Sequence, residues 1–156
     1  MRLLARATFL CATAIVLSSA GKTLGAQGLE ACKLITAAEA AEALGKPAIA
    51  KAQAIAPEKD TCGYMGAPFD VHTEALPNPT RWSAALKDEI KKGKAEAIPG
   101  VGDDAAYTKD GNGDNIATAR KGKHLVTISI YQNQGSAAQV KPLAIKLLKL
   151  ALSKVP

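Results

Sequence analysis

The sequence predicts a single α+β domain in which an antiparallel sheet is covered by about three helices. The chain has 156 residues, a length that fits one hydrophobic core. Helical patterns at 37–44, at 80–92 and from residue 136 onward separate two groups of strand-like segments. Because these helices do not alternate regularly with strands, as they would in a parallel βαβ fold, we expect an antiparallel sheet with helices on one face.

The first helix is predicted over 37–44 by its two ends. Thr36 and Glu39 have the spacing of a capping box, in which each side chain satisfies a free backbone amide of the first turn. The residues between Thr36 and Gly45 are strong helix formers. Gly45 can adopt the left-handed conformation that ends a helix, and Pro47 prevents its continuation.

Two strand-like segments follow, at 61–65 and 69–76, separated by Gly66-Ala67-Pro68. The second alternates between mainly apolar residues and charged or polar residues, which is typical of a strand with one buried face. Together they predict a half-buried hairpin, whereas the preceding segment 48–56 alternates weakly and predicts a strand poorly. The expected inner side is Phe69, Val71, Thr73 and Ala75, and the outer side is Asp70, His72 and Glu74.

A second helix is predicted after Pro77-Asn78-Pro79, with Thr80 as its cap and Lys92 at its end. Its apolar residues recur every four positions, and Gly93 follows as a terminator. They are Trp82, Leu86 and Ile90.

The segment 98–104 predicts a tight connection, because glycine allows the backbone to turn and carboxylates can bond nearby amides. Strands are predicted next at 105–109, 115–121 and 124–132, the last two joined by a Gly122-Lys123 turn. The last strand has one strongly apolar face, which predicts a central position in the sheet. That face consists of Val126, Ile128 and Ile130.

A C-terminal helix is predicted from a second capping-box pattern at Ser136 and Gln139. It would direct Val140, Leu143 and Leu147 toward the core. Pro142 interrupts the pattern, since proline removes a helical hydrogen bond beyond the first turn. The helix is therefore expected either to start near Pro142 or to bend there.

The N-terminus has the pattern of a secretory signal over residues 1–20, with cleavage after Ala20 or alternatively after Ala26. Its uncharged stretch is too short for a transmembrane anchor, and Cys11 lacks the small residues that precede a lipid-modified cysteine. We expect an exported protein, periplasmic or secreted, with a flexible segment at 21–30 and the folded domain at 31–156.

Removal of the signal would leave two cysteines, Cys32 and Cys62. In an oxidising compartment these cysteines are expected to form one disulfide. It would close a loop of about 30 residues and, in the chain-entropy treatment, add roughly 3.6 kcal/mol to the free energy of unfolding. The alternative is a pair of buried free thiols.

The basic charge does not indicate nucleic-acid binding. Residues 1–20 contain Arg2 and Arg6 and no acid, so their removal lowers the formal charge from +6 to +4. Only Arg81 and Arg120 would remain, and lysine cannot make the planar two-point contacts that arginine makes with guanine or phosphate. The lysines 141, 146, 149 and 154 are expected to complement a helix end, with docking to a membrane surface as the alternative.

Two groups of residues are weak candidates for metal binding. Asp110, Asn112 and Asp114 mimic the start of a calcium loop, but Asn115 and Lys121 stand where that loop needs glycine and glutamate. A polar hairpin loop is the expected interpretation. The other group is His72 and His124, on predicted strands, for which the spacing carries no signature and a surface position is expected.

No nucleophile motif is present beyond the predicted signal: there is no glycine-flanked serine elbow, and no serine after residue 20 stands three residues before a lysine. Paired acids such as Asp103 with Asp104, or Asp70 with Glu74, would do acid–base chemistry only if burial separated their pKa values. No cofactor is expected.

Three short stretches together resemble a loose group of small exported bacterial proteins of unknown function, many of them lipoproteins. They are residues 31–39 running into Ala43-Leu44-Gly45, then Cys62-Gly63-Tyr64, then residues 101–105. The resemblance implies a disulfide between the first helix and an early strand, and a helix-on-sheet domain. It brings no catalytic residues, and this chain departs from the lipoprotein members in lacking a lipobox.

We therefore expect a non-catalytic binding or accessory module of the cell envelope that recognises an unknown small ligand or partner protein through its sheet face or loops. The alternatives are an envelope hydrolase using Asp103 and Asp104, and a metal-handling protein using His72 and His124.

Overall fold

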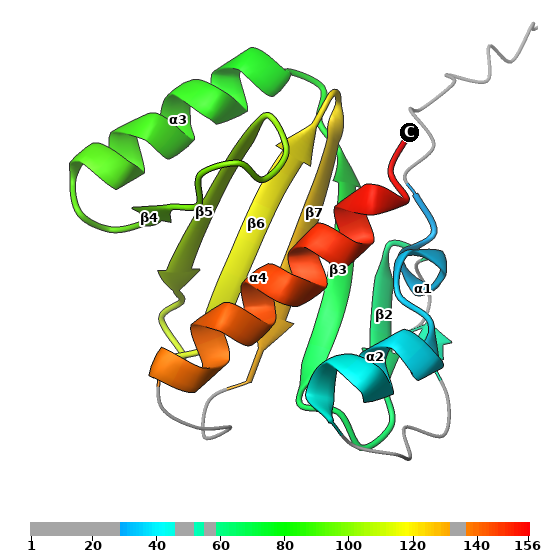
Figure 1. The fold of residues 1–156 in the computed structure, drawn as a ribbon. Helices are drawn as coiled ribbons and strands as arrows, with labels where there is room; N and C mark the ends of the chain where they lie inside the picture. The colour runs from blue at the N-terminus through cyan, green and yellow to red at the C-terminus, as the bar shows by residue number, and fades with distance from the viewer. Residues whose placement is uncertain (1–28, 46–51, 55–58, 132–136) are drawn as a thin grey trace, which may run out of the picture.

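The described strands form one antiparallel sheet, as the sequence predicts. The structure is a computed structural model that describes residues 29–45, 52–54, 59–131 and 137–156. Its sheet has seven strands in the order β1-β2-β3-β7-β6-β5-β4 (Figure 1). The elements are α1 (Ala31–Leu34), α2 (Ala37–Leu44), β1 (Ala52–Ala54), β2 (Thr61–Tyr64), β3 (Phe69–Ala75), α3 (Pro79–Lys91), β4 (Glu96–Ala97), β5 (Asp104–Lys109), β6 (Asn115–Lys121), β7 (His124–Ile130) and α4 (Ala137–Ser153).

The strand β7 lies at the centre of the sheet, which confirms the position predicted from its apolar face. It pairs with β3 from Phe69↔Ile130 to Ala75↔His124 and with β6 on its other side. The β3–β7 pairing joins strands that are distant in sequence, and the other neighbours are consecutive along the chain. The two halves of the chain are thus held together along a full seven-residue ladder.

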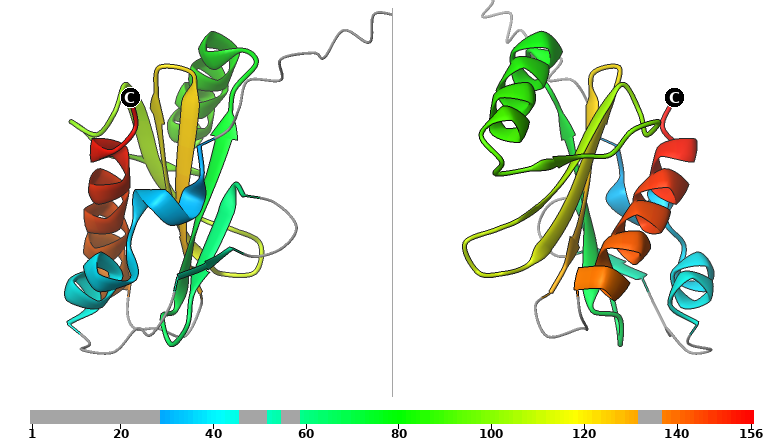
Figure 2. Two further views of the ribbon diagram at one scale, coloured as in Figure 1. Left: turned by 90° about the vertical axis from the view of Figure 1, so that its right-hand side faces the viewer. Right: turned by 60° about the vertical axis from the view of Figure 1, so that its left-hand side comes forward.

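The main core lies between the sheet and α4, with α1 and α2 beside α4 on the same side (Figures 1 and 2). Alternate residues of the central strands point to this side, which is the geometry of a strand with one buried face. The fully buried side chains include Phe69, Val71, Val126, Ile128, Ile130, Leu147 and Leu148.

The helix α3 lies on the other side of the sheet, so the expectation that all helices cover one face is wrong (Figure 2). Three buried residues, Leu76, Ala106 and Leu125, do not belong to the main core cluster. Ala106 and Leu125 alternate with core residues of their strands and therefore face away from α4. The sheet thus buries apolar side chains on both faces.

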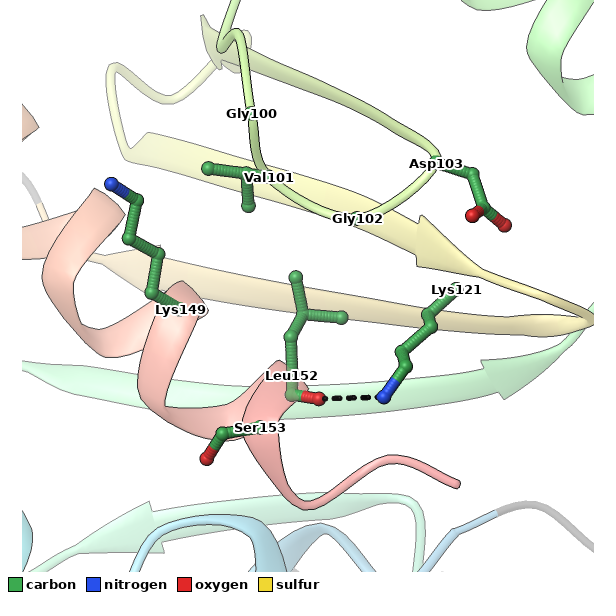
Figure 3. Close-up of a pocket in the computed structure, with 8 residues that line it drawn as sticks. All are labelled: Gly100, Val101, Gly102, Asp103, Lys121, Lys149, Leu152 and Ser153. Atoms are coloured by element: carbon green, nitrogen blue, oxygen red, sulfur yellow. Dashed lines mark hydrogen bonds between the residues drawn. The ribbon is translucent and has the colours of Figure 1, made fainter.

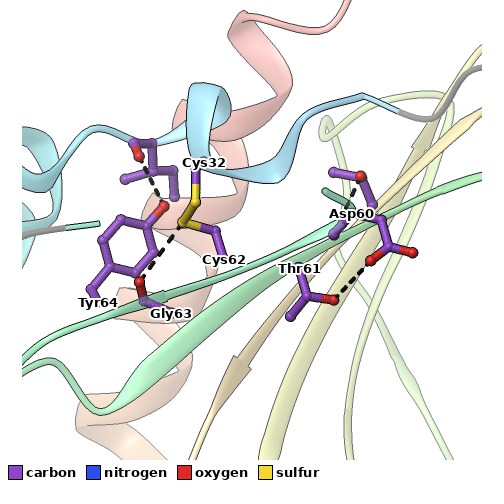
Figure 4. Close-up of a disulfide and its surroundings, with 8 residues drawn as sticks. Cys32, Asp60, Thr61, Cys62, Gly63 and Tyr64 are labelled. Carbon is purple, nitrogen blue, oxygen red and sulfur yellow. Dashed lines mark hydrogen bonds between the residues drawn. A yellow bond between two sulfur atoms is a disulfide. The ribbon is translucent and has the colours of Figure 1, made fainter. Parts of the chain in front are cut away.

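The predicted disulfide is confirmed: Cys32 of α1 is bonded to Cys62 of β2 (Figure 4). The short helix α1 has no counterpart in the sequence prediction. Tyr64 donates a hydrogen bond of 2.8 Å to the carbonyl of Ile35 beside the bridge and stacks on Phe69. The segment after α1 is therefore fixed to the sheet by a covalent bond and a buried hydrogen bond.

The helix ends agree with the sequence prediction in part. The capping box of Thr36 and Glu39 is confirmed, and Gly45 has a left-handed φ of 64°. The cap of α3 is Asn78 rather than Thr80: its side-chain oxygen accepts from the amide of Arg81, and Pro79 takes the first helical position, where its missing N–H costs nothing. Pro142 lies inside α4 rather than at its start.

The N-terminal prediction falls largely outside the described residues. These exclude the predicted signal at 1–20 and most of the segment 21–30. The last two residues of that segment are described, and the carbonyl of Leu29 accepts a 2.7 Å hydrogen bond from the hydroxyl of Thr73. None of the described helices is long and apolar enough to cross a bilayer.

Candidate functional site

The loop 98–104, which connects β4 to β5, lies between α3 and α4 and has a hollow on each side. The hollow toward α4, here called the loop–helix pocket, has a volume of about 350 Å³ (Figure 3). The hollow toward α3 has a volume of about 290 Å³, and Leu86 and Ile90 of α3 contribute to its wall. The loop–helix pocket is lined by Gly100, Val101, Gly102, Asp103, Lys121, Lys149, Leu152 and Ser153.

The loop is held against β5 and β6 by backbone contacts. The amide of Asp103 donates to the carbonyl of Arg120 at 2.8 Å, and the amide of Ile98 donates to the carbonyl of Ala105 at 3.0 Å. Gly102 has a φ of +61°, and a Cβ atom there would lie 2.4 Å from the Arg120 carbonyl oxygen. The site is thus built on a fixed loop, which reduces the entropy cost of binding.

Arg120 connects this loop to α3. Its guanidinium contacts Asp103 at 2.8 Å and Asp104 at 2.7 Å, and its Nε lies 3.1 Å from the hydroxyl of Ser83. Ser83 also donates to Asp104 at 2.6 Å. The Ser83 hydroxyl and the guanidinium hold the pKa of Asp104 below its usual value.

This arrangement does not favour the hydrolase alternative. A general acid at neutral pH needs a raised pKa, and that of Asp104 is lowered. The Asp103 carboxylate accepts from the amide of Gly122 at 2.8 Å as well as from Arg120. The two adjacent acids that the sequence offers for a hydrolase therefore form an ion-pair cluster with Arg120. Through Asp103 this cluster links the 98–104 loop to the turn between β6 and β7.

The loop–helix pocket places apolar groups in its centre and ammonium groups at its sides. Val101 of the loop and Leu152 of α4 face one another, with Lys149 on one side and Lys121 on the other (Figure 3). Val101 is buried, whereas Lys149 is exposed. The carboxylate of Asp103 points away from α4, toward Arg120 and Gly122 (Figure 3).

Lys121 is fixed by the C-terminal end of α4. Its Nζ donates to the carbonyl of Val155 and lies 3.5 Å from the carbonyl of Leu152. Leu152 is in the last turn of α4, where carbonyls lie at the negative end of the helix dipole and stabilise a cation, and Val155 follows directly after the helix. Both partners of Lys121 are neutral carbonyls, so neither of them is an acid that would compensate its charge.

Lys149 has no ion-pair partner among the described residues. The one acid that lines the pocket, Asp103, is bonded to Arg120. The pocket therefore presents two ammonium groups, and its single carboxylate is already neutralised. Such a site attracts an anion.

A second hollow, here called the α4 groove, adjoins the pocket and shares Lys149 with it. Its volume is about 640 Å³, and its walls are Lys141, Pro142, Ile145, Lys146 and Lys149. Lys141 forms an ion pair with Glu96 of β4, and its ammonium lies 5.5 Å from the centre of the Tyr107 ring. The positive charge at that end of the groove is thus compensated.

The two predicted histidine candidates do not come together. His72 pairs with Thr127 and His124 pairs with Ala75, so the side chains point to opposite faces of the sheet. His72 lies 3.0 Å from the hydroxyl of Thr61. His124 is buried, and burial lowers its pKa. These two residues cannot bind the same ion.

The calcium-like string forms a hairpin loop stabilised by its own first residue. The Asp110 carboxylate accepts from the amides of Asn112 and Asp114, each at 2.9 Å. These contacts are those of an Asx turn. Within the described segments, no group of three or more histidine, cysteine, aspartate or glutamate side chains is placed to hold a metal ion.

The open part of the sheet face beside α3 carries a partly buried acid, Asp70. Burial raises its pKa, although a 3.1 Å hydrogen bond from the hydroxyl of Tyr131 opposes that effect. Tyr131 and Met65 are the large apolar side chains exposed in the described part of the chain.

No protein family, no curated protein sequence and no solved structure matches this chain. The sequence predicts Lys149 near a helix end and Lys121 at the end of a strand, but it contains no signal that they line one pocket. That proximity depends on how α4 packs on β6.

Proposed function

We propose that this chain is an exported, non-catalytic binding module of the cell envelope that takes a small anionic ligand in the loop–helix pocket. The observation that carries the proposal is that Lys121 and Lys149 flank one hollow, on opposite sides of Val101 and Leu152, and that the one acid lining it is engaged with Arg120. Its volume of about 350 Å³ is within the range of small-molecule sites. Export is supported by the N-terminal sequence pattern and by the disulfide, since persistent disulfides belong to oxidising compartments.

A fixed loop and a fixed lysine suit binding more than chemistry. Lys121 is held by α4 carbonyls, and Gly102 and Asp103 hold the loop against Arg120. A ligand would thus meet cations that are already in position and would pay little ordering cost. The sheet face, the other surface considered from the sequence, carries a partly buried acid, Asp70, whose pKa is raised by burial.

The test is titration calorimetry of the oxidised protein with inorganic phosphate, acetate and citrate at constant ionic strength. The variant Lys149→Gln removes the exposed ammonium and should weaken binding about 10-fold or more, since hydrogen bonds to charged groups contribute about 1.5–3 kcal/mol. Lys91→Gln is the matched control, because Lys91 is an exposed lysine on α3, remote from the pocket. Equal affinity in all three proteins would refute the pocket as the binding site.

A further inference from the structure

The loop–helix pocket and the α4 groove lie next to one another and differ in chemical character. They meet at Lys149, which lines both. The pocket end has the two ammonium groups of Lys121 and Lys149. The groove end has Pro142 and Ile145 together with the aliphatic stems of its lysines, which can cover apolar surface while their charges reach solvent.

The charge along this surface is asymmetric. At the groove's far end Lys141 is paired with Glu96 and lies over Tyr107, so its charge is compensated. At the pocket end the charges of Lys121 and Lys149 are not compensated by any described acid. A molecule with one anionic end would therefore be oriented, with that end at the pocket.

The surface is elongated along α4. Pro142 and Leu152 are ten residues apart, a rise of about 15 Å along a helix. A small compact anion would fill only the pocket end. An extended chain attached to the anion would continue over Ile145 and Pro142.

We propose that the ligand is a single-chain amphiphile with a terminal anionic group, bound with its acid between Lys121 and Lys149 and its alkyl chain in the α4 groove. This inference rests on the proposed function and specifies its ligand class. Ile145 is partly buried and Pro142 is exposed at the groove, so an alkyl chain would cover apolar surface that otherwise meets water.

The features favour one bound molecule over docking to a bilayer. Membrane docking of a folded domain needs several free cations or protruding apolar side chains. On α4 only Lys146 and Lys149 are exposed lysines without an ion-pair partner among the described residues. Lys154, just after the helix, is paired with Glu39. The exposed large apolar side chains, Met65 and Tyr131, lie elsewhere.

The experiment is a calorimetric series of linear carboxylates from acetate to decanoate, each kept below its micelle concentration, with the oxidised protein. Affinity should rise about two- to four-fold with each added methylene until the groove is filled, because a fully buried methylene corresponds to about four-fold. Lys149→Gln should lower the affinity of every member by a similar factor. Ile145→Ser should flatten the dependence on chain length and leave acetate unchanged.

A second variant distinguishes the loss of an alkyl contact from a folding defect. Pro142→Glu replaces an exposed proline by a good helix former and places a carboxylate beside the alkyl path. It should weaken decanoate about ten-fold and acetate less than two-fold. Met65→Ser removes an exposed apolar side chain far from the groove and should leave the whole series unchanged.

The outcomes separate this inference from the proposed function. Acetate binding that depends on Lys149 but does not strengthen with chain length would refute the amphiphile and leave the anion site intact. Absence of binding throughout the series would refute the amphiphile, and absence of phosphate and citrate binding as well would refute the anion site. Sedimentation with vesicles of phosphatidylglycerol, unaffected by Ile145→Ser and without binding of the soluble carboxylates, would show bilayer docking and would also overturn the inference.

Discussion

Gly102 passes so close to Arg120 that a Cβ atom on Gly102 would lie 2.4 Å from the Arg120 carbonyl oxygen. The adjacent amide of Asp103 donates to that same oxygen at 2.8 Å. The loop that forms one wall of the pocket therefore depends on a residue without a side chain. Three other contacts have equally testable consequences: the Cys32–Cys62 bridge, the Asp104–Arg120 ion pair and the hydrogen bond from Tyr131 to Asp70.

Gly102→Ala should destabilise the protein by more than about 2 kcal/mol, because a left-handed conformation and a backbone clash are combined at one residue. Gly100→Ala is the control. Gly100 has a φ of +71°, but nothing lies within 4 Å of its Cβ position, so the cost should be about 1 kcal/mol. Urea unfolding measures both, and equal losses would contradict the close approach.

Replacement of both Cys32 and Cys62 by alanine should lower the free energy of unfolding by about 3–4 kcal/mol. The bridge closes a loop with a sequence separation of 30 and restricts the unfolded chain. Wild-type protein in reductant should lose a comparable amount, and the double variant should not respond to reductant. A wild-type protein equally stable with and without reductant would show that the bridge contributes nothing.

Asp104→Asn should destabilise the protein by about 1–3 kcal/mol at pH 7, since it removes a charged acceptor from Ser83 and Arg120. The folded-state pKa of Asp104 lies below its unfolded value, so its contribution is present above the unfolded pKa and is lost as pH falls through the folded pKa. The difference between wild type and variant should therefore shrink below about pH 4.

The control for this measurement is Asp88→Asn, which removes an exposed acid paired with Lys92 within α3 and should cost less than about 0.5 kcal/mol. The double variant Asp103→Asn with Asp104→Asn also addresses the hydrolase alternative. Lost stability fits the ion-pair cluster with Arg120. Unchanged stability with loss of a hydrolytic activity would favour the enzyme.

Asp70→Asn should stabilise the protein at pH 7. Burial raises the folded-state pKa of Asp70, so the charged form destabilises the fold and the penalty grows as pH rises through the unfolded and folded pKa values. Asparagine has no charge and can still accept the hydrogen bond from Tyr131. Thermal unfolding should show the gain at pH 7 and its disappearance near pH 3, where Asp70 is protonated in both states.

Glu74→Gln serves as the comparison for Asp70→Asn. Glu74 lies on the same strand and the same face but is exposed, so its neutralisation should leave the stability nearly unchanged at both pH values. A similar gain in both variants would indicate a general charge effect instead of the burial of Asp70.

Much of the fold followed from local rules. The capping box of Thr36 and Glu39 needs only residues three apart, and the alternation in β3 and β7 needs only neighbours along one strand. The features that were predicted wrongly or not at all depended on competition between neighbouring residues for one cap position, or on contacts between distant segments. Asn78 displaced Thr80 as the cap of α3 because Pro79 suits the first helical position, and the two-residue strand β4 exists only through its pairing with β5.

The sequence by itself determined the longer helices and strands, the central place of β7, and the pairing of its two downstream cysteines, because periodicity, caps and a cysteine count are written along the chain. Tertiary structure decided the side on which α3 packs and placed Lys121 and Lys149 on the walls of one pocket. Residues 28 positions apart line the same hollow only when α4 lies across β6, and no local pattern encodes that arrangement. The register of β3 on β7 separated His72 from His124, and the pairing of β5 with β6 placed Asp104 opposite Arg120.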